Sequence, residues 1–450
     1  MEIRSSYQVE ITNLRRIFEP TVRIYRDVIA YLISVCQKRW QNIEQLPENN
    51  ERDHYVEHLV HSTKSNVAEY PDFDTLFPKL PSYLRRAAIR SALGLVSSYA
   101  SNHQNWVKGG RRGREPKLQP VTREMPIFYR GNMYKPSEDD ENCGYLKLYV
   151  QKDWKFVKVH FRPTDIRYLK NHLSDVEASA PILEKRYHKY YLRFSFQEEV
   201  TLSSTPVSEQ RICAVDLGLN TDAVCTILCA DGTVSARKFI HFAGDKDRLY
   251  RALNRIKKMQ RKYGCKSTKG LWNYVKRLNG ELTEKIASAI TEFAIQYGAD
   301  VIVFEHLNFK GAKLWGSNKQ KISLWRKNGI QNSVTHKAHR AGIRISRVCA
   351  TNTSRLAFDG SGEVDRSREN FSLCTFPSGK HYHCDLNASL NIGARYFIRE
   401  FLKPFSEREK SQFSAKVPET VRRSNCTFST FRKLYKLMAG VQSCKAAVLC

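Results

Sequence analysis

Residues 211–217, RICAVDL, form a short apolar stretch that ends just after an aspartate. A run this short and this apolar is typical of a buried strand. Two more strand-like segments follow, AVCTILC at 223–229 and TVSARKFI at 233–240, joined by a turn that contains Asp-Gly. Helical stretches come next, and strands are expected again at 299–307 (ADVIVFEHL) and 343–350 (IRISRVCA). These segments predict a five-stranded sheet in the C-terminal half.

The order of these elements indicates the architecture of that half. Three strands in a meander are followed by helices that alternate with two strands, and an amphipathic helix begins near Asp385 (DLNASLNIGARYFIREFL). This is the order of an RNase H-like α/β fold. In such a sheet the first strand lies centrally beside the fourth, and the last helix packs across that edge. We therefore predict an RNase H-like α/β domain.

Three carboxylates are placed to meet in this fold. Asp216 lies in the first strand, Glu305 near the end of the fourth and Asp385 at the start of the last helix, at spacings of 89 and 80 residues. Taken singly, each has an ordinary explanation, as a helix cap or a solvated strand end. Together they would form a cluster that cannot stay fully ionised without cations. The sequence thus predicts that all three bind magnesium, as two ions, for phosphodiester hydrolysis.

The net charge indicates a polyanionic partner. Lys and Arg number 74 against 45 Asp and Glu, which gives a net charge of +29. Such an excess favours nucleic acid over small neutral metabolites, with an anionic membrane surface as the weaker alternative. We find no apolar run long enough to span a membrane, and twelve cysteines are too sparse for a disulfide scaffold in 450 residues. A cytoplasmic protein with no membrane partner is expected.

Two segments concentrate the basic charge. Residues 246–280 contain twelve basic side chains and one acid, whereas a solvated helix face normally mixes both signs. The glycine-rich stretch 108–119 is also basic. Nucleic-acid contact is therefore favoured over a purely solvated face. The candidate nucleic-acid-binding residues are Lys108, Arg111, Arg112, Arg114, Arg248, Arg251, Arg255, Lys257, Lys258, Arg261 and Lys262.

The N-terminal half has a different pattern. Residues 3–11 alternate as a strand does, and most of the stretch to residue 107 has helical periodicity. Strand-like segments in which aromatics alternate with Lys and Arg follow at 125–131, 145–151, 154–161 and 187–197. This predicts a helical domain and a small β-barrel, whose aromatics either stack on bases or simply form its core.

Three motifs carry a resemblance to a known family. AVDLGLNTDAV, VIVFEHLNF and DLNASLNIGARY resemble, in this order, the three RuvC nuclease motifs, and the chain resembles TnpB and the miniature type V CRISPR effectors. The resemblance covers about residues 205–400 by motif and residues 1–205 by layout. It implies an RNA-guided DNA endonuclease whose single RuvC site holds its metal on Asp216, Glu305 and Asp385. The implied partners are a guide RNA and a double-stranded DNA target with a short flanking motif, with a homodimer on one RNA as one stoichiometry.

The resemblance also divides the chain into parts. They are the first strand of a wedge β-barrel (1–13), a helical recognition domain (14–107), the rest of the wedge barrel (108–205), the first part of a RuvC-like nuclease (206–350), a degenerate zinc-ribbon-like insert (351–384), the second part of the nuclease (385–402) and a C-terminal tail (403–450).

The insert departs from the family pattern. The family has two CxxC pairs there, but Ala357 and Gly360 stand at the first pair, and Pro377 replaces the partner of Cys374. Cys349, Cys374 and Cys384 are weak zinc candidates, because a closed structural site needs four well-placed ligands. We therefore expect this segment to be free of zinc.

Two other functions are compatible with the sequence. One is an RNA-guided DNA-binding protein that does not cleave. The other is a guide-free RuvC-type resolvase or transposase, of which a resolvase would not need the roughly 200 residues that precede the nuclease motifs.

Overall fold

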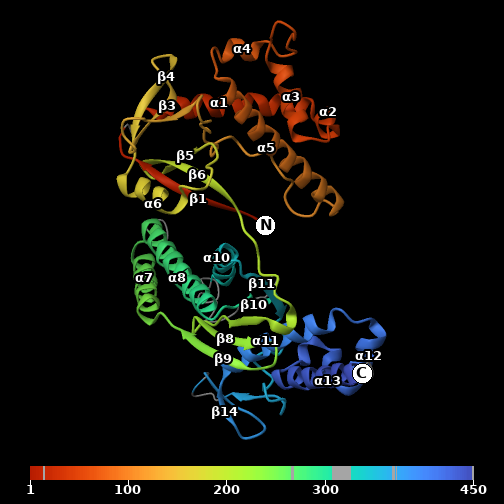
Figure 1. The fold of residues 1–450 in the computed structure, drawn as a ribbon. Coiled ribbons are helices and arrows are strands. Elements are labelled where there is room, and N and C mark those ends of the chain that lie inside the picture. The colour runs from red at the N-terminus through yellow and green to blue at the C-terminus, as the bar shows by residue number, and fades with distance from the viewer. Residues whose placement is uncertain (14–15, 265–267, 307–325, 367–369, 371, 448–450) are drawn as a thin grey trace. The chain divides into compact units, whose positions relative to one another are not determined.

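The computed structural model describes residues 1–450 except 14–15, 265–267, 307–325, 367–369, 371 and 448–450 (Figure 1). It divides into two compact units, one of residues 2–198 and the other of Met1 with residues 199–450. In the described part of the chain, no helix combines the length and apolar character that crossing a bilayer requires.

The N-terminal unit combines helices with two small sheets around one buried core. Its elements are β1 (Glu2–Ile11), α1 (Phe18–Lys38), α2 (Trp40–Gln45), α3 (Asn49–Val60), α4 (Asp72–Leu76), α5 (Ser82–Lys108), β2 (Tyr134–Pro136), β3 (Cys143–Val150), β4 (Asp153–His160), α6 (Pro163–Leu173), β5 (Ile182–Arg186) and β6 (Lys189–Glu199). The predicted strand at 3–11 and the helices after it are confirmed.

The strands of this unit differ from the single barrel that we expected. Within the described residues they form two three-stranded sheets, ordered β1-β6-β5 and β2-β3-β4. The segment 125–131, expected as a strand, contributes two isolated pairs there, Arg130 with Tyr134 and Ile127 with Ile182. Pro126 directly precedes Ile127, and Pro181 directly precedes Ile182. Because proline has no N–H to donate, the ladder cannot continue on that side.

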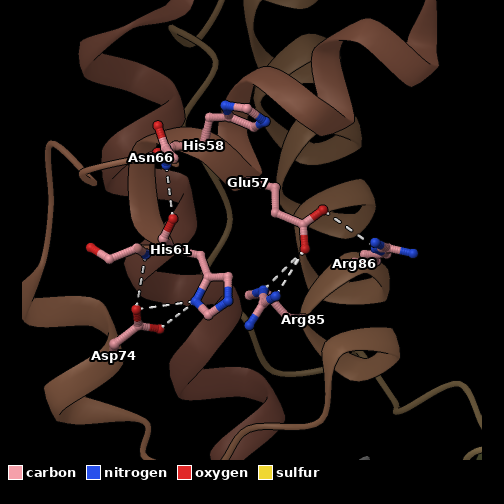
Figure 2. A network of polar contacts seen from close by, with 8 residues as sticks. Glu57, His58, His61, Asn66, Asp74, Arg85 and Arg86 are labelled. Atoms are coloured by element: carbon pink, nitrogen blue, oxygen red, sulfur yellow. Dashed lines mark hydrogen bonds and ion pairs between the residues drawn. The ribbon is translucent and has the colours of Figure 1, made fainter. Parts of the chain in front are cut away.

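Ion pairs hold α3 against α5. Glu57 on α3 accepts hydrogen bonds from Arg85 at 2.9 Å and Arg86 at 3.3 Å, both on α5 (Figure 2). The side chains of Arg85 and Glu57 are only 9% and 14% exposed. Nearby, the His61 ring lies 3.0 Å from a carboxylate oxygen of Asp74, which ties the end of α3 to α4. These polar contacts fix how the helices of this unit pack.

The C-terminal unit contains the predicted α/β sheet. Its elements are η1 (Val207–Glu209), β7 (Arg211–Asp216), β8 (Ala223–Cys229), β9 (Val234–Ile240), α7 (Ala243–Tyr263), α8 (Lys269–Gln296), β10 (Val301–His306), α10 (Lys327–Arg340), β11 (Arg344–Cys349), β12 (Asp365–Arg366), β13 (Leu373–Thr375), β14 (His381–His383), α11 (Cys384–Leu402), α12 (Glu407–Lys416), η3 (Pro418–Val421), η4 (Arg423–Asn425) and α13 (Phe428–Ala447).

The order of the strands is the one predicted from the sequence. The five-stranded sheet runs β11-β10-β7-β8-β9, with β7 antiparallel to β8 and parallel to β10. The first strand of this unit therefore lies centrally beside the fourth, as in an RNase H-like sheet, and the meander β7-β8-β9 occupies one side. A second, three-stranded sheet, β12-β13-β14, lies between β11 and α11 in the sequence.

Helices cover both faces of the five-stranded sheet. Cys213 and Val215 point into a core formed with α8 and α10, whereas Ile212 and Ala214 point into one formed with α11 and α13. Helix α11 lies very close to the sheet, because a Cβ atom at Gly393 would stand 2.9 Å from Leu228 and 3.2 Å from Ala214. Glycine is therefore required at this point of the helix.

The α3–α5 ion pairs lead to a prediction about stability. Glu57→Gln leaves the buried guanidinium of Arg85 without its counter-charge, which costs about 3 kcal/mol of the free energy of unfolding. Glu141→Gln breaks the exposed pair with Lys170, whose side chains are 70% and 65% exposed, and should cost less than about 1 kcal/mol. Urea unfolding followed by circular dichroism compares the two variants. Equal losses would contradict a structural role for the buried pair.

Candidate functional site

Asp216 and Glu305 are neighbours at the end of two parallel strands. The register of β7 and β10 pairs Ile212 with Val301 and, three residues later, Val215 with Phe304. Asp216 and Glu305 are the next residues on each strand. Because side chains alternate along a strand, both carboxylates lie on the face that α11 covers. The sheet therefore brings together two acids that are 89 residues apart.

Asp385 approaches from α11, of which it is the second residue. The His383 ring accepts a hydrogen bond from the backbone N–H of Asp385 and so caps the helix. A Cβ atom on Gly218 would lie 3.7 Å from Oδ2 of Asp385 and only 2.6 Å from the carbonyl oxygen of Thr221. The loop that follows Asp216 is therefore packed tightly beside the Asp385 carboxylate.

The three carboxylates interact electrostatically. Burial raises the pKa of Asp216 well above its usual value, and the charges of Glu305 and Asp385 raise that pKa further. Arg366 opposes this shift. A carboxyl group whose ionisation is this unfavourable is a strong candidate for cation binding.

Glu305 has its own set of partners. Burial raises its pKa, while the hydroxyl of Thr353, which donates a hydrogen bond to Oε1, lowers it, as do the charges of Arg395 and Lys327. The hydrogen bond from Thr353 also fixes the orientation of the carboxylate. One of its two oxygens is thus used within the protein.

A polar stripe on α11 supports the site from behind. Asn387, Asn391 and Arg395 follow one another at intervals of four residues and are all buried. Asn391 donates 2.9 Å hydrogen bonds to the carbonyls of Thr353 and Leu356. Arg395 donates four hydrogen bonds of 2.7–3.0 Å to the carbonyls of Cys349, Thr351, Ser424 and Cys426.

Sequence analysis did not identify Thr353 or this stripe as parts of the site. The signal for the stripe was present, because polar residues at four-residue spacing inside an apolar helix must find buried partners. Thr353 carried no comparable signal, since its role depends on where a loop places it.

The donor set can be compared with the needs of magnesium. Three partly buried carboxylates supply the hard oxygen ligands that Mg²⁺ prefers, so the chemistry of the site fits this ion. Among the residues that the structure describes, however, no three His, Cys, Asp or Glu side chains converge closely enough to hold one metal ion. The carboxylates would therefore have to draw together around a cation.

The insert before α11 has an apolar interior. Ala357, Cys374, Phe376 and Cys384 are buried together, with Phe358 packed against them. Of the weak zinc candidates, Cys374 and Cys384 lie in this cluster. Cys349 is the last residue of β11, and its carbonyl is bound by Arg395.

The predicted nucleic-acid-binding residues keep their charges at the surface. All the basic side chains predicted on α7 are exposed, because that helix buries Leu253 and Ile256 against Val275 of α8. Lys108, at the end of α5, and the arginines in the stretch after it are exposed too. These positions suit contact with phosphates, which stays a prediction.

Comparisons with known proteins bear on the fold. A model described as the Aq_aa04 family matches residues 5–150, and no curated protein matches the sequence. Among solved structures, the mini-RNA-guided endonuclease CRISPR-Cas phi3 is 11% identical with a TM-score of 0.52, over 87% of this chain and 92% of that one.

Two further structures are similar to the chain. Cas12f1, solved with sgRNA and target DNA, is 16% identical with a TM-score of 0.49, over 84% of this chain and 81% of that one. C2c1 of Alicyclobacillus acidoterrestris, solved with single-guide RNA, is 10% identical with a TM-score of 0.44, over 82% and 67% of the two chains.

The raised pKa of Asp216 predicts how stability depends on pH. Because the folded chain binds this proton more tightly than the unfolded chain does, the free energy of unfolding falls as pH rises from the unfolded towards the folded pKa. In the presence of a chelator, Asp216→Asn removes the buried charge and should stabilise the protein by about 1–3 kcal/mol at pH 8. This gain in the free energy of unfolding should become smaller as the pH is lowered to 5. Denaturant unfolding of the native chain and the variant at several pH values measures the gain.

The exposed Asp247 on α7 provides the control for this prediction. Asp247→Asn should leave the free energy of unfolding nearly unchanged at every pH. A gain for Asp216→Asn that does not vary with pH, or a loss, would contradict the interpretation of a destabilising buried charge.

The composition of the insert predicts its metal content. Because its interior is apolar, the purified full-length chain should hold much less than one zinc per molecule after dialysis, as measured by mass spectrometry. One zinc per chain that survives dialysis and is lost in both Cys374→Ser and Cys384→Ser would show that the insert is a metal site.

Proposed function

We propose that this chain, which shares the fold of the miniature type V effector nucleases, is an RNA-guided DNA endonuclease. The observation that carries the proposal is the position of Asp216, Glu305 and Asp385 at one end of an RNase H-like sheet. A guide RNA would pair with one strand of double-stranded DNA, and this single site would hydrolyse the target phosphodiesters. The RNA and DNA in the Cas12f1 structure support these partners.

The three carboxylates would hold two magnesium ions. When bound, these ions would activate a water molecule and stabilise the leaving oxygen. The protein's own part is to space and orient the acids: β7 and β10 fix the spacing of Asp216 and Glu305, and Thr353 holds one oxygen of Glu305. The cap by His383 positions Asp385 at the helix start.

The two basic surfaces would bind the nucleic acid. The basic side chains between Arg248 and Lys262 lie exposed along α7, which packs against α8 of the same unit. Such a row of cations suits the phosphates of an RNA or of an RNA–DNA heteroduplex. In the other unit, the basic stretch after α5 would do the same. We further propose that residues 14–107 and the small sheets read the guide and the target duplex.

The test is a cleavage assay on a supercoiled plasmid with Mg²⁺ and the RNA that co-purifies with the chain when it is expressed from its native locus. Asp216→Ala should reduce the cleavage rate at least about a hundredfold, because a water molecule in place of the carboxylate would supply neither its negative charge nor its fixed position. Target binding should change less than about twofold, since positive charges elsewhere supply most of the affinity. A gel-shift assay in the same buffer measures the affinity for the target.

Asp231→Ala provides the matched control, because Asp231 lies in the β8–β9 turn at the opposite end of the sheet. Normal cleavage by Asp216→Ala would contradict the site. If the native chain binds its target without cutting it, the non-cleaving alternative holds. Cleavage of branched DNA without RNA would instead indicate a guide-free enzyme.

A further inference from the structure

Phe239 is an exposed aromatic side chain close to the carboxylates. It lies on β9, the outer strand of the five-stranded sheet, and is 48% exposed. Its ring makes a T-shaped contact with the ring of His383, with the ring centres 4.9 Å apart and the planes at 74°. His383 is the residue that caps α11 next to Asp385. Phe239 therefore contacts His383, the residue that positions Asp385, while much of the Phe239 ring faces solvent.

Strand register fixes the place of Phe239 relative to Asp216. Asp216 pairs with Val224, and Val224 pairs with Phe239, so the three residues form one row across the sheet. Paired residues point to the same side, which puts Phe239 on the face that carries the carboxylates. With strands about 4.8 Å apart, Phe239 stands on the order of 10 Å from Asp216 along this row.

Basic charge accompanies this ring. Arg237, two residues earlier on β9, is exposed and points to the same face. Its partner in the ladder is Thr226, whose hydroxyl bonds to Ser389 of α11 at 2.6 Å, which confirms that this face is the one that α11 covers. An exposed aromatic ring with a cation beside it is the combination with which proteins hold a base and its phosphate.

We propose that Phe239, backed by His383, is a platform on which one nucleobase of the cleaved strand stacks, so that the neighbouring phosphate is held at the carboxylates. This inference rests on the proposed function, because it concerns the substrate of the same site. An aromatic ring stacks on any base, so the platform positions the strand without selecting a sequence. Phe239 is thus a substrate-binding residue, and Arg237 is placed to contact the backbone of the same strand.

The first experiment measures stacking without cleavage. The full chain is titrated with single-stranded DNA containing 2-aminopurine, in buffer with Ca²⁺ in place of Mg²⁺, and fluorescence quenching reports stacking. The native chain and Phe239→Trp should quench the probe strongly, and Phe239→Leu should quench it several-fold less. Ile295→Ala is the control, since Ile295 is 52% exposed at the end of α8, away from the site, and should behave as the native chain does.

The second experiment separates stacking from a structural role. Substrates that carry one abasic site at successive positions are cleaved under guided conditions. For the native chain, one position should slow cleavage about tenfold, in line with the usual strength of base–aromatic stacking. Phe239→Leu should cleave the intact strand as slowly as the native chain cleaves that abasic substrate, and the abasic site should slow the variant no further. If Phe239 only supported His383, the variant and the abasic site would each lower the cleavage rate independently, and the two factors would multiply.

The outcomes distinguish this inference from the proposed function. Equal quenching by Phe239→Leu and the native chain, or no quenching by either, overturns the platform. If the native chain cleaves and multiplied losses are seen, the platform is wrong and the endonuclease stands. If no protein cleaves but quenching depends on Phe239, the ring does stack on nucleobases, but the proposed endonuclease activity fails and with it the role of Phe239 in holding a cleaved strand.

Discussion

The structure of the C-terminal unit depends on the cost of burying like charges. Asp216 and Glu305 lie on adjacent parallel strands, one strand spacing apart, and burial makes ionisation of both unfavourable. Asp385 adds a third charge to the same end of the sheet. A chain relieves such repulsion by separating the acids unless the surrounding packing prevents it. The rest of this unit therefore has to hold the three acids in place.

Helix α11 provides most of that restraint. Gly393 lets it lie directly against β7 and β8, which fixes its distance from the sheet. Asn391 and Arg395 then bind the backbone of the loops on either side, including the carbonyl of Thr353. Because Thr353 in turn orients Glu305, one helix positions Asp385 directly and Glu305 through a loop. Loss of any of these buried polar contacts would loosen two acids at once.

The sequence was sufficient to predict the sheet and the positions of the three acids on it, whose metal binding stays a prediction, but not the residues that support them. Asp216 and Glu305 are easy to recognise because an acid near the end of a short apolar run is unusual. The predicted order of the strands then makes these two runs neighbours in the sheet. The role of Thr353 depends on loop geometry that has no local pattern. In the N-terminal unit the alternating aromatics predict one barrel, whereas Pro126 and Pro181 stop the ladder beside Ile127 and Ile182. Helix α6, which the sequence analysis did not predict, begins at Pro163, and proline is a favoured first helical residue.

The insert and helix α13 of the C-terminal tail also help to hold Asp385 in place. A three-stranded sheet this small cannot form a sufficient core by itself. The insert is therefore attached to neighbouring helices through Phe358, which precedes the sheet. The backbone N–H of Phe358 donates to the side-chain oxygen of Asn387 on α11 at 2.7 Å, and its carbonyl accepts from the backbone N–H of Ser429 on α13 at 2.8 Å. The insert ends in β14, whose last residue, His383, caps α11. Contacts with α11 and α13 thus stabilise the insert from outside, and through His383 the insert in turn supports Asp385.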